Sequence, residues 1–177
     1  MKKTILFLSA LGILACKNEP KDYVLFTGKI IDKNSDSIVI SNRDYTKTIK
    51  VNEDGTFSDT LKVTTGVFGV YDGKEQTTIF LANDMDLKMT LDAKTFDESI
   101  KFSGKGAEKS TFLVDRIKFE QDLVDVEALK NLEASKLDSS LEDIKTKMLA
   151  YYDKNAAIDS TIISEARKQV DPMLKGL

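Results

Sequence analysis

Histidine and tryptophan are absent from this sequence of 177 residues, and cysteine occurs once, at Cys16. Without histidine the chain lacks the commonest general base, the Ser-His-Asp arrangement and the usual zinc and copper ligands. With a single cysteine it can form neither an internal disulfide nor a Cys-x-x-Cys redox pair. We therefore expect no catalytic site in this chain, and no bound cofactor or metal ion.

An excess of positive charge is also absent. The chain has 26 Lys and Arg residues against 29 Asp and Glu residues, which gives a formal net charge of −3. Removal of residues 1–15 takes away Lys2 and Lys3 and lowers the net charge from −3 to −5. Because nucleic-acid binding usually requires a basic surface, we expect no nucleic-acid partner. After residue 15, no apolar run approaches the roughly 20 residues that a membrane-spanning helix needs.

The N-terminal stretch has the parts of a secretory signal peptide, which we assign to residues 1–15. Two lysines precede an apolar run from Thr4 to Ala15, and Cys16 follows directly. The segment Ile-Leu-Ala-Cys that ends at Cys16 resembles the bacterial lipobox, which implies that Cys16 is lipidated, with acyl chains such as palmitate. Residues 16–22 are then the lipidated cysteine and a polar tether. The alternative is an ordinary signal peptide with an incidental cysteine.

Residues 23–104 predict an antiparallel β domain. Short runs rich in β-branched and aromatic residues alternate with turns, two of which contain the Asp-Gly pairs at 54–55 and 72–73. About eight short strands favour an antiparallel β-sandwich or barrel, and no helical crossover supports a parallel sheet. The expected strands are 23–31, 37–41, 48–51, 56–63, 66–71, 77–81, 86–91 and 100–102.

Residues 105–177 change to the helical period, and we expect about three helices in this C-terminal segment. Ser139 and Glu142 have the spacing of a capping box at the start of the second helix. Ser160 is the expected cap of the third helix, which Pro172 should end or kink. The fold class is therefore β plus α. Packing within the protein explains the apolar stripes of these helices, with a partner-binding helix as the alternative.

One group of polar residues resembles a calcium loop. Asp32, Asn34 and Asp36 match the opening of an EF-hand, which then requires Gly at the sixth position and Glu at the twelfth. Those two positions hold Ser37 and Arg43. We therefore interpret the triplet as a turn between strands, because Asn, Asp and Ser side chains readily bond their own backbone.

A second group is the carboxylate pair Asp84 and Asp86, which lies at the expected entrance to a strand. Residues two apart in a strand point to the same side, so the pair is a candidate for acid–base chemistry. A turn and a solvated strand face explain the same two residues, and we favour that interpretation.

Four segments of strand and turn residues carry a family resemblance. They are Phe-Thr-Gly-Lys-Ile at 26–30, Ile-Lys-Val-Asn-Glu-Asp-Gly-Thr-Phe at 49–57, Ile-Phe-Leu-Ala-Asn-Asp at 79–84 and Phe-Ser-Gly-Lys-Gly-Ala-Glu at 102–108. They resemble the β domain that precedes the thioredoxin-like domain in Bacteroidota lipoproteins of the TlpA/ResA type, which are thiol–disulfide oxidoreductases related to the AhpC/TSA family. The lipobox and the helical segment fit the same layout. The resemblance implies the scaffold and an envelope location, but the family's active site is a Trp-Cys-x-x-Cys motif that this chain does not contain.

These patterns lead to three functional hypotheses. The first is a lipid-anchored cell-envelope module, on the outer membrane rather than the inner, that binds or positions a partner such as a separate redox protein. The second is the N-terminal part of a thiol–disulfide oxidoreductase, inactive as it stands. The third is a β-sandwich that binds a small ligand such as a glycan. The candidate sugar-binding aromatic residues are Tyr23, Phe68, Tyr71 and Phe80, most of which we expect in the core.

Overall fold

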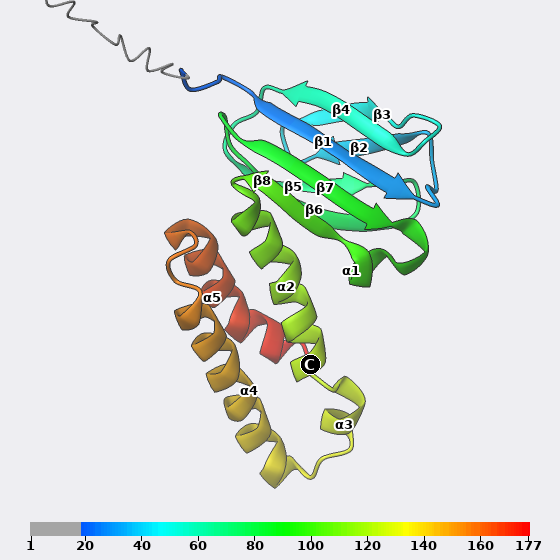
Figure 1. Cartoon of the computed structure of the whole chain (residues 1–177). Helices are drawn as coiled ribbons and strands as arrows, with labels where there is room; N and C mark the ends of the chain where they lie inside the picture. Colours follow the sequence, from blue (N-terminus) through cyan, green and yellow to red (C-terminus); the bar gives the residue numbers. More distant parts are fainter. Residues whose placement is uncertain (1–18) are drawn as a thin grey trace, which may run out of the picture.

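The computed structural model describes residues 19–177. The expected signal peptide and the lipidation site Cys16 lie outside the described residues. Eight strands come first and the long helices follow (Figure 1). The strands are β1 Val24–Ile31, β2 Ser37–Ser41, β3 Thr46–Lys50, β4 Thr56–Leu61, β5 Gly66–Tyr71, β6 Gln76–Leu81, β7 Asp86–Asp92 and β8 Lys101–Lys105. The helices are α1 Phe96–Ser99, α2 Ala107–Leu123, α3 Val126–Lys130, α4 Ala134–Lys154 and α5 Ser160–Lys175, and a 3₁₀ turn at Ala93–Thr95 precedes α1.

The strands form two four-stranded sheets, as the predicted β-sandwich requires. Sheet A has the order β4-β1-β7-β8, and sheet B has the order β3-β2-β5-β6. Figure 1 shows one sheet behind the other, with the strands of sheet A in front. Alternate residues of each strand point inward, so the core between the sheets collects buried side chains from both. The largest of these are Phe26, Ile38, Ile40, Ile49, Leu61, Phe68, Ile79, Leu81, Leu87 and Met89.

The prediction of β plus α structure with about eight antiparallel strands is confirmed, except for one strand pair. Strands β1 and β7 are parallel, in a register that runs from Leu25 opposite Asp86 to Ile31 opposite Asp92. We expected no parallel pair because no helical crossover was visible. The chain instead leaves β1 for sheet B, returns for β4, visits sheet B again and comes back as β7. Strands of the opposite sheet therefore provide the crossover.

A glycine turns the chain from the sandwich into the helices. Gly106 precedes α2 with a φ of 86°, in the left-handed region where a side chain is strained. A Cβ atom at this position would lie 2.5 Å from the Met85 side chain. This close approach sets the point at which α2 leaves strand β8.

Helix α2 contacts the edge strands of both sheets, β6 and β8. Edge strands carry backbone groups without a strand partner, which proteins often cover with another element. Here the fully buried Ser110 of α2 supplies the cover: its hydroxyl accepts a hydrogen bond from the Phe80 backbone N–H at 3.0 Å and lies 3.4 Å from the Phe80 carbonyl oxygen. The Ser110 hydroxyl thus accepts the backbone hydrogen bond that a neighbouring strand would otherwise accept at this edge of β6.

The long helices α2, α4 and α5 lie together on one side of the sandwich (Figure 1). Tyr151 of α4 stacks on Phe119 of α2, with ring centroids 4.2 Å apart, and the Tyr152 hydroxyl donates to Glu120 at 2.5 Å. The three expected helices are therefore present.

None of the helices within residues 19–177 combines the length and the apolar character that crossing a bilayer requires.

The predicted helix ends were wrong in detail. Helix α4 begins at Ala134, so Ser139 lies inside it and donates to the Lys136 carbonyl instead of capping the start. The cap of α5 is Asp159, one residue before the expected Ser160. Helix α5 also continues beyond Pro172 to Lys175. Pro172 has no N–H to donate to the carbonyl four residues earlier, so the helix continues past it without that one hydrogen bond.

Candidate functional site

The residues of the EF-hand-like triplet have separate partners. Asp32 pairs with Lys94 at 2.7 Å, the Asn34 amide donates to Asp72 at 2.8 Å, and Asp36 pairs with a lysine of its own loop. Within residues 19–177, no group of three or more His, Cys, Asp or Glu side chains is arranged to hold a metal ion. The interpretation of the triplet as a turn agrees with these contacts.

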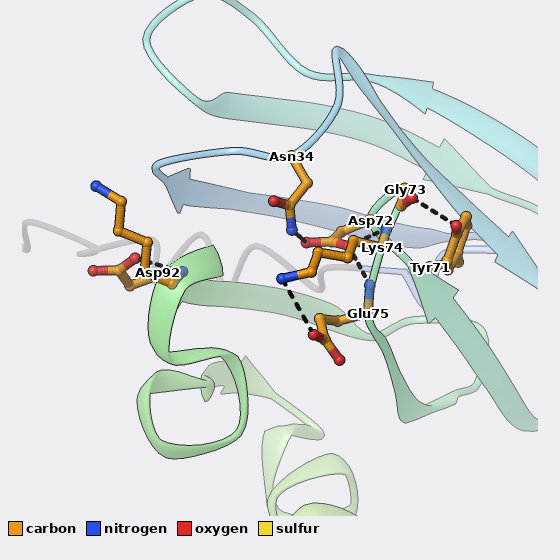
Figure 2. Close-up of polar contacts among 8 residues, drawn as sticks. Asn34, Tyr71, Asp72, Gly73, Lys74, Glu75 and Asp92 are labelled. Carbon is orange, nitrogen blue, oxygen red and sulfur yellow. Dashed lines mark hydrogen bonds and ion pairs between the residues drawn. The ribbon is translucent and has the colours of Figure 1, made fainter.

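Asp72 is the buried carboxylate of this region, with 2% of its surface exposed. Figure 2 shows how it joins the β1–β2 loop to the β5–β6 turn: one oxygen accepts from Asn34, and the other accepts from the backbone N–H groups of Lys74 and Glu75 at 2.9 and 2.8 Å. Short polar side chains commonly close turns in this way. Because its oxygens are occupied by these bonds, Asp72 stabilises the turn.

The carboxylate pair lines one open hollow over sheet A, but its two members have different surroundings. Asp84 accepts a hydrogen bond from the Lys21 backbone N–H at 3.1 Å and contacts the Lys105 ammonium group. The hydrogen bond from Lys105 holds the pKa of Asp84 below its usual range, so this carboxyl is ionised near neutral pH. Asp86 is exposed on sheet A, opposite Lys105 in the β7–β8 register. An ionised Asp84 cannot act as a proton donor. Its hydrogen bond from Lys21 instead holds the end of the tether against the sandwich.

The four candidate aromatic residues differ in exposure. Phe68 and Phe80 are buried, and Tyr23 is half-buried. Tyr71 is 42% exposed, and its hydroxyl donates to the Gly73 carbonyl at 2.6 Å. The expectation that most of these rings pack in the core therefore holds for the two phenylalanines.

A groove lies where the helices meet the outer face of sheet B, and we call it the α2 groove. Its volume is about 420 Å³. Strands β5 and β6 form the floor, α2 forms one wall, and the first turns of α5 form the other. Val67 in the floor is 44% exposed, a large value for an apolar residue. The lining residues are Thr65, Gly66, Val67, Thr78, Phe80, Leu113, Arg116, Ile117, Asp159, Thr161, Ile162 and Glu165.

The lysine next to Ser110 joins the two walls of the groove. The Lys109 ammonium group lies 2.6 Å from Asp159 and 4.5 Å from the centre of the Phe80 ring, at cation–π distance. Asp159 also caps α5, because it accepts hydrogen bonds from the backbone N–H groups of Thr161 and Ile162 at 2.9 and 3.1 Å. The hydrogen bond from Lys109 lowers the pKa of Asp159. Helix α5 is therefore attached to α2 through its N-cap residue.

Arg116 lines the groove and has a buried nitrogen without a hydrogen-bond partner in the described part of the chain. Its Nε lies 3.2 Å from Glu120 Oε1, but this buried nitrogen forms no hydrogen bond with residues 19–177. The same Glu120 oxygen already accepts the hydroxyl hydrogen of Tyr152. Burial, together with the hydrogen bond to Glu120, raises the pKa of Tyr152 and keeps it a neutral donor. The guanidinium of Arg116 thus faces the carboxylate of Glu120, which already accepts a hydrogen bond from Tyr152.

The sequence patterns did not predict the α2 groove, because its residues come from three distant segments. Among its lining residues only Phe80 was a candidate, as an exposed aromatic, and it is buried. An available signal was Asp159 before Ser160, since Asp is a strong N-cap residue. Comparison with protein-family models, curated proteins and solved structures found no match. The geometry of the described residues therefore carries the functional argument.

The Lys109–Asp159 pair makes a pH-dependent contribution to stability. The pKa of Asp159 is lower in the folded chain than in the unfolded chain, where it is about 3.9. The stabilisation from the ion pair is thus present above about pH 4, and it is lost as the pH falls through the lower pKa that Asp159 has in the folded chain. Asp159→Asn retains a helix cap and should reduce the free energy of unfolding by about 1 kcal/mol at pH 7, after allowance for solvent screening.

Urea unfolding at pH 7 and at pH 3 measures this difference, which should shrink at the lower pH. The control is Asp153→Asn, which removes the exposed pair with Arg167 and should change little at either pH. A difference between Asp159→Asn and wild type that is the same at both pH values would show that the ion pair is not its cause.

Proposed function

We propose that this chain is a lipid-anchored protein of the cell envelope, on the outer membrane rather than the inner, that binds a small apolar ligand in the α2 groove. The observation that carries the binding role is the groove itself, in which the exposed Val67 lies beside largely buried apolar side chains of the sheet and the two helices. Pockets that bind small molecules are mostly apolar and hold a few convergent polar groups, with volumes of roughly 300–1,000 Å³. The α2 groove fits this description at about 420 Å³.

The apolar part of the groove comes from all three of its sides. Val67 and Phe80 contribute from sheet B, Leu113 and Ile117 from α2, and Ile162 from α5. Phe80, Leu113 and Ile162 are held rigidly because the rest of each side chain is buried in the protein. A preformed apolar surface binds a ligand without the cost of ordering mobile side chains.

The anchoring role rests on the leader and on the resemblance of the segment before Cys16 to a lipobox. The contacts of residues 21 and 22 limit the length of the free tether. The Lys21 backbone bonds to Asp84 at 3.1 Å, and Asp22 pairs with Lys62 at 2.6 Å. Only the five residues from Cys16 to Pro20 then separate a lipid from the sandwich, a reach of at most roughly 17 Å. Such a tether would keep the sandwich close to the membrane surface.

Replacement of the lipidation site tests the anchoring role. Cys16→Ser should abolish incorporation of labelled palmitate and move the protein from the membrane fraction to the soluble fraction, because no acyl chain remains to insert into the bilayer. Lys17→Ser is the matched control and should remain labelled and membrane-bound. A wild-type protein that takes up no palmitate, or a Cys16→Ser variant that stays with the membrane, would sink the anchoring proposal.

A bulky residue in the floor of the groove tests the binding role. The neutral apolar dye N-phenyl-1-naphthylamine should bind the wild-type protein with increased fluorescence, and Val67→Trp should weaken that binding because the larger side chain fills the groove. The control is Ile31→Trp, which enlarges an exposed β-branched residue on sheet A that does not line the groove. The two variants losing dye binding equally, or neither losing it, would argue against the groove as the site.

A further inference from the structure

We propose that the α2 groove selects ligands that join an apolar body to a single anionic group, and that Arg116 binds this group. The inference rests on the proposed binding role of the groove and adds the chemical class of the ligand. The class is that of small amphipathic monoanions, such as medium-chain carboxylates.

The first argument is the incomplete coordination of Arg116. A guanidinium carries five N–H donors in a planar fork that matches the two oxygens of a carboxylate. Within residues 19–177 the contact of this guanidinium with a carboxylate is the one between Nε and Glu120, and it does not meet hydrogen-bond geometry. Glu120 is occupied by the Tyr152 hydroxyl on the same oxygen. Nε is buried and turned toward Glu120, but the two Nη groups form no hydrogen bond with residues 19–177 and are not among its buried unpaired atoms, so they remain as donors for an anion that enters the groove.

The second argument is that the two acidic residues of the groove are already paired. Asp159 accepts from Lys109 and from two backbone N–H groups of its own helix. Glu165 pairs with Lys168 on α5 at 2.6 Å. Each carboxylate of the lining therefore has a lysine beside it, which reduces its repulsion of an incoming anion.

The third argument is the position of Arg116 among apolar groups. It follows Leu113 by three residues and precedes Ile117 on α2, and all three line the groove. An ion pair beside apolar surface is less exposed to water and is stronger than one on an open surface. A ligand that fills the apolar floor near Val67 can at the same time present its charged end to α2.

A pair of dyes that differ by one charged group provides the test. 1-Anilinonaphthalene-8-sulfonate has the aromatic body of N-phenyl-1-naphthylamine and adds a sulfonate. The wild-type protein should bind the sulfonate about tenfold more tightly, the ratio that one charge-assisted hydrogen bond supplies. Arg116→Gln should remove this preference and leave the affinity for the neutral dye within about twofold. Arg43→Gln, at an exposed turn, is the matched control and should keep it.

The natural chemistry is tested by competition. Octanoate should displace the anionic dye from the wild-type protein, whereas octylammonium, with a chain of the same length and the opposite charge, should not. Circular dichroism and thermal unfolding of Arg116→Gln establish that the variant is folded. Arg116→Lys, which keeps the charge but not the fork, should show an intermediate preference.

The outcomes separate this inference from the proposed function. Equal binding of both dyes to the wild-type protein, with both blocked by Val67→Trp, would overturn the anion preference and leave the groove as a binding site. A tenfold preference that persists in Arg116→Gln would also overturn it. Binding of neither dye would overturn the inference and the binding role together.

Discussion

The hydrogen bond between the Ser110 hydroxyl and the backbone of Phe80 is the contact on which the rest of the structure depends. Strand β6 is the outer strand of sheet B, so its free edge needs a partner that is not a strand. A buried backbone N–H without an acceptor costs about 1–3 kcal/mol. Ser110 provides the acceptor from α2 and thereby fixes the helix along the edge of the sandwich. Helices α4 and α5 contact α2 in turn, through Tyr151, Tyr152 and Asp159.

The α2 groove is a consequence of this attachment. With α2 fixed at Ser110, the adjacent Lys109 reaches both Phe80 and Asp159, and Asp159 in turn begins α5. Residues of these two helices and of strands β5 and β6 then line the groove together. Farther along α2, Glu120 is taken up by Tyr152 of α4, which leaves Arg116 with an incomplete set of partners. The packing that stabilises the helices thus also places the Arg116 guanidinium beside the apolar floor of the groove.

Much of the fold was predictable because local patterns specify it. The strands at 37–41 and 66–71 were predicted to the residue, since alternating apolar residues and turn residues mark both of their ends. The parallel pairing of β1 with β7 was not, because it depends on the path of the chain between two sheets. The predicted cap of α4 was wrong. Ser139 fits a capping pattern, but the helix begins five residues earlier, at Ala134. The role of Arg116 could not be predicted from the sequence, because it depends on the positions of Glu120, Tyr152 and the sheet, which come together only in the folded chain.

The most direct test of this account is the stability of Ser110→Ala in urea, compared with that of Ser139→Ala. Both variants remove a helical serine hydroxyl, but Ser139 is exposed and bonds only within its own helix, to the Lys136 carbonyl. Ser110→Ala should lower the free energy of unfolding by about 1–3 kcal/mol, because it leaves the Phe80 N–H buried without an acceptor. Ser139→Ala should stay within about 0.5 kcal/mol of wild type. Equal stability of the two variants would contradict the claim that Ser110 fastens the helices to the sandwich.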